Sequence, residues 1–181
     1  MALDQALDAA VRAYIADRHV GEVVAARWLR WGAADATALL RLAEALALGA
    51  NQLADLTEWL EDIAGRDGAA PAAVLGEPEI RGILAAPLGR SDKLKRVKAR
   101  VRALRYPRLA ALERSLEETV RALDLGPGVT VRFPPALEGD EVTVEVRARR
   151  PETLRDAVGR LARALEGGGF DRIFSQLDEV S

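Results

Sequence analysis

Apolar residues recur every three or four positions through residues 3–65, which is the spacing of amphipathic helices. Glycines and short polar stretches divide this region into four predicted helices, the first of which contains Leu3. We expect Asp35 to cap the third helix and Asn51 to cap the fourth, because these residue types accept hydrogen bonds from free helix amides. Residues 1–65 are therefore predicted to form an N-terminal helical domain.

Residues 66–91 interrupt this pattern. Pro71, Pro78 and Pro87 lie here among several glycines, and this composition is typical of a connector that holds only short helices. We expect such helices near residues 71–75 and 79–84. The sequence places its best domain boundary in this connector.

A longer helix follows, with Ser91 or Asp92 as its predicted N-cap. It has a narrow apolar seam formed by Leu94, Val97, Val101 and Leu104. Pro107 should end this helix and can open the next one at its first position, where a missing amide hydrogen does no harm. The seam then resumes out of phase from Leu109 to Leu123.

The spacing changes to period two after Gly126-Pro127-Gly128, which predicts a β-hairpin with strands at 129–133 and 141–149, joined through Asp140. A helix over 151–166 follows, with Leu154, Val158, Leu161 and Leu165 on one face. The glycines at 167–169 are predicted to be a flexible break before a short amphipathic helix that runs from Phe170 to Val180. The expected fold is α+β and predominantly helical: the N-terminal region, then domain 92–166 with the basic helix and an α-β-β-α unit containing one antiparallel hairpin, then a Gly-linked helix at 167–181.

Positive charge is concentrated in residues 90–108. This stretch has nine lysines and arginines and one acid, a net charge of +8, whereas the whole chain carries −2 and the remainder about −10. Every lysine of the chain lies here, at Lys93, Lys95 and Lys98.

This charge has two interpretations. Concentrated cations attract phosphates through counterion release, which favours nucleic-acid binding, with DNA as the first expectation. The candidate contacts are Arg90, Lys93, Lys95, Arg96, Lys98, Arg100, Arg102, Arg105 and Arg108. Phosphate contacts carry no base information, so binding without sequence preference is expected. In the alternative, these cations pair with acidic patches of the same chain or of a protein partner.

Little in the sequence points to catalysis. The chain has no cysteine and a single histidine, His19, which excludes thiolate metal sites and His-based triads. Its serines lie in no nucleophile motif, and the stretch at 89–93 lacks the second glycine and the Lys-Ser/Thr pair of a P-loop. The densest acidic cluster, Glu58, Glu61 and Asp62, is interpreted as a solvated helix face. We therefore expect a non-enzymatic protein without metal or cofactor; a carboxylate-dependent enzyme is the remaining alternative.

A lone hairpin is only marginally stable and leaves its edges unpaired. Pairing with a second copy would remove an edge, so the sequence predicts a homodimer. The predicted interface residues are Val129, Val131, Phe133, Val142, Val144 and Val146.

The order helix, strand, strand, helix resembles the C-terminal dimerisation domain of the ParB family of partition proteins. The matching segments are Leu125-Gly126, Val129-Thr130-Val131, Val142-Thr143-Val144-Glu145-Val146 and Pro151-Glu152-Thr153-Leu154. The resemblance covers under a third of the chain and implies a domain that dimerises and binds DNA without sequence preference. The family's arginine-rich nucleotide-binding box and helix-turn-helix have no counterpart here.

Two further interpretations stay open. In a winged-helix arrangement, the helix over 108–123 would read DNA and the hairpin would be the wing, but the charges of that helix are mixed. In a protein adaptor, the acidic N-terminal region and the C-terminal helix would dock on a partner. No apolar run is long enough to span a bilayer and the N-terminus does not resemble a secretory signal, so a cytoplasmic location is expected.

Overall fold

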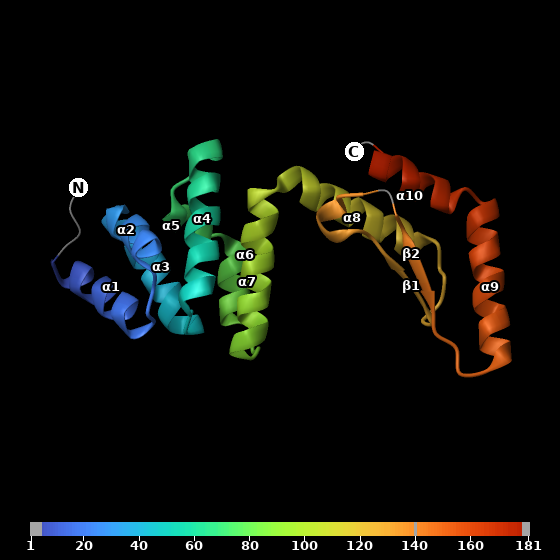
Figure 1. The fold of residues 1–181 in the computed structure, drawn as a ribbon, viewed down its shortest axis with the longest axis horizontal. Helices are drawn as coiled ribbons and strands as arrows, with labels where there is room; N and C mark the ends of the chain where they lie inside the picture. Colours follow the sequence, from blue (N-terminus) through green and yellow to red (C-terminus); the bar gives the residue numbers. More distant parts are fainter. Residues whose placement is uncertain (1–4, 140, 179–181) are drawn as a thin grey trace. The chain divides into compact units, whose positions relative to one another are not determined.

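A computed structural model describes residues 5–139 and 141–178; the predicted contributions of Leu3, Asp140 and Val180 lie outside the described residues. The chain divides into two compact units between Tyr106 and Pro107 (Figure 1). Each unit has its own cluster of buried apolar side chains.

Unit 1 is all helical within its described residues. Its helices are α1 (Gln5–Asp17), α2 (Glu22–Arg30), α3 (Ala33–Leu46), α4 (Ala50–Asp67), α5 (Pro71–Leu75), α6 (Pro78–Ala85) and α7 (Arg90–Arg105). Trp28, Leu39, Leu53, Leu56 and Leu60 are fully buried at its centre. The predicted helices of residues 3–65 are therefore confirmed over the part that the structure describes, and they enclose one core.

The predicted helix caps are wrong. Gly32, Gly49 and Gly89 precede α3, α4 and α7, so each of these helices begins before the residue expected to cap it. The Asp35 carboxylate instead accepts the amide hydrogen of Ala72 at 2.8 Å and ties α3 to α5. Gln52 satisfies the start of α4, because its side-chain oxygen accepts the amide hydrogen of Gly49 at 2.9 Å.

The region predicted as a connector, residues 66–91, is an integral part of unit 1. Its two short helices form as expected, each with proline at its first position. Val74, Leu75 and Ile80 are buried in the core, and α5 packs against α3 and α4. These side chains are buried in the same core as those of α1–α4. The boundary between the two units therefore lies at the end of α7, after the predicted connector.

Unit 2 contains the predicted hairpin between helices. Its elements are α8 (Pro107–Ala122), β1 (Val129–Arg132), a 3-10 turn (Pro135–Leu137), β2 (Thr143–Val146), α9 (Pro151–Glu166) and α10 (Gly169–Asp178). The strands pair antiparallel, with Val129 opposite Val146 and Val131 opposite Val144. The predominantly helical α+β fold with one two-stranded sheet is confirmed, although β2 is shorter than predicted.

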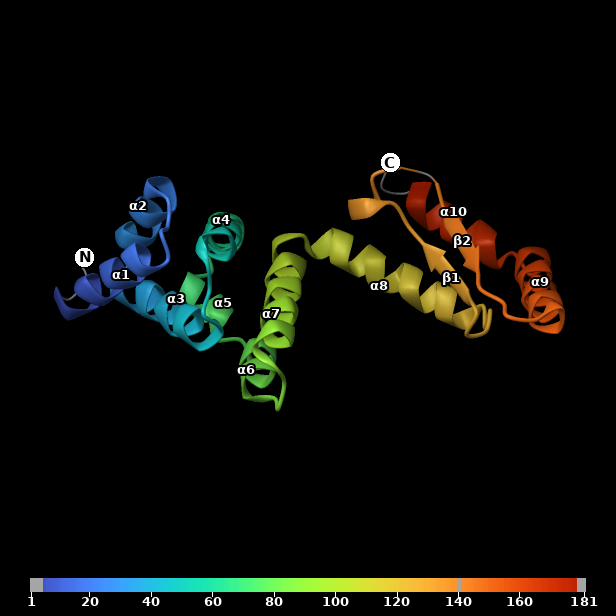
Figure 2. The same cartoon turned by 60° about the horizontal axis from the view of Figure 1, so that its bottom comes forward.

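The core of unit 2 joins α8, the hairpin and α10. Leu116, Leu125, Phe170 and Ile173 are buried there, and α10 packs against α8 and α9. In both views α9 stands at an edge of this unit (Figure 2). The glycines predicted as a flexible break are a tight corner, because a side chain at Gly169 would collide with Leu123. None of the described helices is both long and apolar enough to cross a membrane.

Candidate functional site

The basic helix α7 is built into the core of unit 1. Val97 and Val101 are fully buried, and Leu94 and Leu104 pack against the same cluster. The helix contacts α3, α4 and α6 and lies beside α4 in Figure 1. The predicted apolar seam is confirmed, and it fixes which cations of α7 face acidic neighbours.

One flank of α7 is paired with acids of α4. The Lys98 ammonium lies 2.6 Å from the Asp55 carboxylate. Arg105 contacts Glu58 at 2.8 Å and Asp62 at 2.6 Å. Burial lowers the pKa of Arg105, but its bond to Glu58 and the charge of Asp62 outweigh burial and raise this pKa above its usual value. Two of the acids first interpreted as a solvated face, Glu58 and Asp62, therefore bind a cation of α7.

The other flank of α7 is paired with residues of α6 and the turn before it. Arg100 contacts Glu77 at 2.9 Å and Glu79 at 3.1 Å. Lys93 donates a hydrogen bond to the backbone oxygen of Leu84 at 2.6 Å. At the end of α7, Arg66 donates to the carbonyl oxygens of Leu104 and Arg105. The interpretation of the basic stretch as an intramolecular partner of acids therefore accounts for Lys98, Arg100 and Arg105.

Three cations of α7 remain exposed. Arg90, Lys95 and Arg96 are exposed and have no acidic partner among the described residues. Arg102 is half-buried, and Arg108 is exposed on α8 in unit 2. Of the nine cations predicted to contact nucleic acid, these three form the group on α7 that is most available to a polyanion.

The predicted dimer residues of the hairpin are largely used inside unit 2. Val129, Val131, Phe133 and Val142 pack against the core formed with α8 and α10. Val146 is half-buried and Val144 is exposed. The apolar side of the hairpin therefore covers its own unit, and Val144 is the predicted interface residue most open to solvent.

A different surface of unit 2 exposes large apolar side chains. We call it the apolar face; it consists of Val144 (37% exposed), Leu154 (46%), Val158 (54%), Leu165 (59%) and Phe174 (43%). A groove of about 260 Å³ lies at one end of it, lined by Val142, Val144, Leu161, Leu165, Phe170 and Phe174. The groove shows that β2, α9 and α10 contribute to one continuous surface.

The orientation of α9 explains this exposure. Ala157 is buried and Ala164 packs against the unit 2 core. The larger stripe of Leu154, Val158 and Leu165 is left outside. The sequence predicts Leu154, Val158, Leu161 and Leu165 on one face of this helix, with the four-three-four spacing that is typical of paired helices. That spacing does not show which of them the same unit covers, and the structure packs Leu161 against the unit 2 core.

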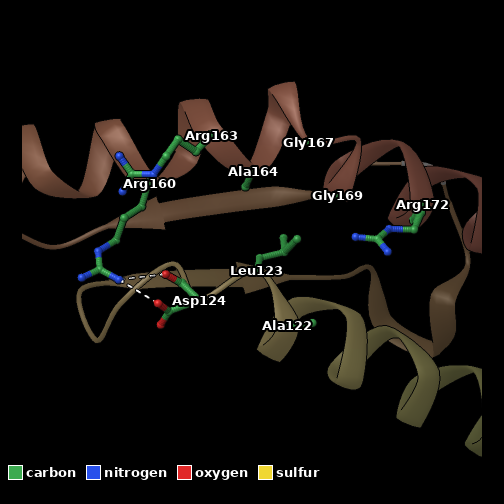
Figure 3. Close-up of a pocket in the computed structure, with 9 residues that line it drawn as sticks. All are labelled: Ala122, Leu123, Asp124, Arg160, Arg163, Ala164, Gly167, Gly169 and Arg172. Carbon is green, nitrogen blue, oxygen red and sulfur yellow. Dashed lines mark hydrogen bonds and ion pairs between the residues drawn. The ribbon is translucent and has the colours of Figure 1, made fainter.

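A second pocket lies where α8, α9 and α10 approach one another in unit 2. It has a volume of about 270 Å³ and is lined by Ala122, Leu123, Asp124, Arg160, Arg163, Ala164, Gly167, Gly169 and Arg172. Figure 3 shows Arg172 extending into it from α10, on the side opposite Arg160. Arg160 donates to the Asp124 carboxylate and carbonyl oxygen, each at 3.1 Å. Asp124 has a positive φ of 47°, so Arg160 holds a turn of unusual backbone conformation against α9.

Among residues 5–139 and 141–178, no group of three or more potential metal ligands lies together. In comparisons with known proteins, no family model matches the chain, and neither a curated protein nor a solved structure matches it significantly.

Proposed function

We propose that this protein is a non-enzymatic binding protein that holds a helix of a polypeptide partner on the apolar face of unit 2. The observation that carries the proposal is the exposure of five large apolar side chains, three of which line one groove. Single apolar residues are common on protein surfaces, but contiguous patches mark interaction sites, because leaving them in water is unfavourable.

The form of the face favours a helical partner. Leu154, Val158, Leu161 and Leu165 follow the spacing that brings two helices together along a seam. Ala162 is exposed beside this seam, and its small side chain permits a close approach. A partner helix with its own apolar stripe would therefore fit here, as helices do in other hydrophobic grooves.

Photo-crosslinking in cells tests this proposal. A photoreactive amino acid is placed at Val158, and a control at Asp156, which is exposed on α9 outside the seam. The Val158 position should give an adduct with one polypeptide, identified by mass spectrometry, that the Asp156 position lacks. Equal labelling at both positions, or no adduct at Val158, contradicts the proposal.

Nucleic-acid binding is a second candidate function, supported by the exposed Arg90, Lys95 and Arg96. In this case unit 2 would serve as the dimerisation domain that its resemblance to the ParB family suggests. Three cations per chain form a small site, and pairing two chains would double it. Such binding would follow phosphates and weaken as salt rises.

Titration of duplex DNA and of RNA at several salt concentrations tests the second candidate. The double variant Lys95→Ala, Arg96→Ala should bind more weakly than the wild type. Its plot of log affinity against log salt should be flatter by roughly 2, at about 0.9 per lost phosphate contact. The control is Arg41→Ala, Arg81→Ala, which removes the same charge from exposed positions outside α7. Equal affinity of the two double variants rejects α7 as the site.

A further inference from the structure

We propose that the pocket between α8, α9 and α10 of unit 2 binds a small dicarboxylate, a molecule with one carboxylate at each end and a short carbon chain between them. This pocket shares no lining residue with the apolar face or its groove, so the site goes beyond the proposed function and does not depend on it. The size of the pocket, the placement of its arginines and its net charge all favour this class of ligand.

The pocket has room for a small organic molecule. Its volume of about 270 Å³ far exceeds the roughly 10–15 Å³ that one buried water needs. It is slightly smaller than the pockets of about 300–1,000 Å³ that usually hold drug-sized ligands. The volume therefore favours a ligand with a few carbon atoms over a single ion.

Arginines stand at two opposite sides of the pocket. Arg172 extends into it from α10, and Arg160 of α9 lies on the other side (Figure 3). Arg163 turns back along α9 towards the side of Arg160, because its Nη1 lies 3.8 Å from the place that a Cβ atom at Gly159 would take. A guanidinium group binds a carboxylate through two parallel hydrogen bonds. A ligand that contacts both sides therefore needs an acidic group at each end.

These arginines have hydrogen-bond donors to offer a ligand. Arg163 and Arg172 are exposed and have no acidic partner within residues 5–139 and 141–178. Arg160 is bound to Asp124, but both of its hydrogen bonds come from Nη1, so its other two nitrogens have no partner in the part of the chain that the structure describes. Three cations around one pocket repel one another, and a bound anion relieves this repulsion.

The charge of the pocket matches one carboxylate at each side. Arg172 contributes one positive charge on its own side. On the other side Arg160 and Arg163 contribute two positive charges and Asp124 removes one, so the lining has a net charge of +2, divided equally between the sides. Two carboxylates would neutralise this charge. Two phosphate monoesters, each with a charge of about −1.5 to −2 at neutral pH, would exceed it.

An apolar wall separates the two groups of arginines. Leu123 and Ala164 lie between Arg160 and Arg172 in Figure 3, and both also pack against the unit 2 core. The close approach of Gly169 holds Leu123 in place, since a side chain at Gly169 would have no room. The middle of the pocket is therefore uncharged and already in position, which suits the methylene groups of a ligand.

An NMR titration of the full chain with glutarate, a short dicarboxylate, tests the proposal. Glutarate should shift the backbone amide signals of Leu123, Gly167 and Gly169 in a saturable way, with a dissociation constant on the order of 1 mM, as expected for so small a ligand. Butyrate has one carboxylate and inorganic phosphate has no carbon chain, so each can engage only one side and should bind about tenfold more weakly. No saturable shift with glutarate, or equal affinity for glutarate and either of the other two, overturns the proposal.

Three variants locate the site. Arg172→Gln and Arg163→Gln should each weaken glutarate binding about tenfold, and unchanged circular dichroism spectra should confirm that these exposed positions leave the fold intact. Arg155→Gln is the matched control, because Arg155 is an exposed arginine of α9 that does not line the pocket, and it should bind glutarate like the wild type. Equal weakening by Arg155→Gln and Arg172→Gln would show general charge attraction and reject the site. Either result leaves the crosslinking test at Val158 unaffected, because the two surfaces share no residue.

Discussion

The Lys98 ammonium lies 2.6 Å from the Asp55 carboxylate and 5.3 Å from the centre of the Trp59 ring. Both partners belong to α4, so one cation of α7 joins two helices through an ion pair and an aromatic contact. Lysine side chains gain from such contacts when their charge is partly removed from water. These two contacts show how the positively charged helix α7 can pack against its neighbours in unit 1.

Replacing Arg105 should destabilise unit 1 more than replacing another cation of the same helix. Arg105→Ala removes a side chain that is 16% exposed and bound to Glu58 and Asp62, so we expect a loss of about 1–2 kcal/mol in the free energy of unfolding. Lys95→Ala should change it by less than about 0.5 kcal/mol, because Lys95 is exposed. Urea denaturation measures both, and equal losses would show that the Arg105 pairs contribute nothing.

The two cores should be separable by spectroscopy. Leu116 is fully buried in unit 2, so Leu116→Ala should cost that unit about 2–5 kcal/mol. All three tryptophans, Trp28, Trp31 and Trp59, lie in unit 1. Thermal unfolding followed by tryptophan fluorescence should therefore keep its midpoint, while circular dichroism detects a transition at lower temperature. A common shift of both signals would mean that the units unfold together.

Much of this fold could be predicted from local spacing. The helices of unit 1, the hairpin and α9 follow periods that depend only on which side of an element is apolar. The true starts of α3 and α4, at Gly32 and Gly49, could not be predicted from local spacing. Asp35, predicted as a cap, instead accepts a hydrogen bond from Ala72, a residue far away in the sequence. Helix starts are the least regular feature of such patterns.

The candidate site was predictable only in part, for a related reason. The charge of residues 90–108 was visible, but its pairing depends on where α4 and α6 place Asp55, Glu58 and Glu77. The stripe on α9 was visible too, whereas its exposure depends on α9 turning Ala157 and Ala164 towards the unit 2 core. Both outcomes are set by tertiary contacts, which the spacing of one helix does not contain.

Replacing two glycines of unit 2 by alanine, one at a time, should change the stability of the unit in opposite directions. Gly169→Ala would force its new methyl group into Leu123, and it should destabilise unit 2 by about 1–3 kcal/mol. Gly159 lies inside α9, and a methyl group there would make an ordinary van der Waals contact with Arg163. Gly159→Ala should therefore stabilise the unit by about 0.5–1 kcal/mol, because alanine favours a helix. Denaturation midpoints from circular dichroism decide this, and loss of stability in both variants would contradict it.

The hairpin contains a carboxylate whose titration is shifted. A hydrogen bond from Arg147 lowers the pKa of Glu145, and the charges of Arg147 and Arg132 act in the same direction. Because the folded pKa is below the unfolded one, this group stabilises the fold above the unfolded pKa, and the contribution is lost as pH falls through the folded pKa. Acid should therefore weaken the hairpin.

An NMR titration of the Glu145 carboxyl carbon measures this shift directly. Arg147→Ala should raise the pKa of Glu145 towards its ordinary value. Arg149→Ala, which removes a nearby exposed cation without a contact to Glu145, should leave that pKa where it is. An unchanged Glu145 pKa in the Arg147 variant would refute the assignment of the cause.

The placement of every lysine on α7 has a chemical consequence. Acetylation, methylation or an amine-reactive label can modify side-chain amines of this helix and of no other element, because the chain has no lysine elsewhere. Lys95 is open to reagents, whereas Lys93 and Lys98 are held by Leu84 and Asp55. The order in which these amines react would therefore report how firmly one helix is seated, without any engineered label.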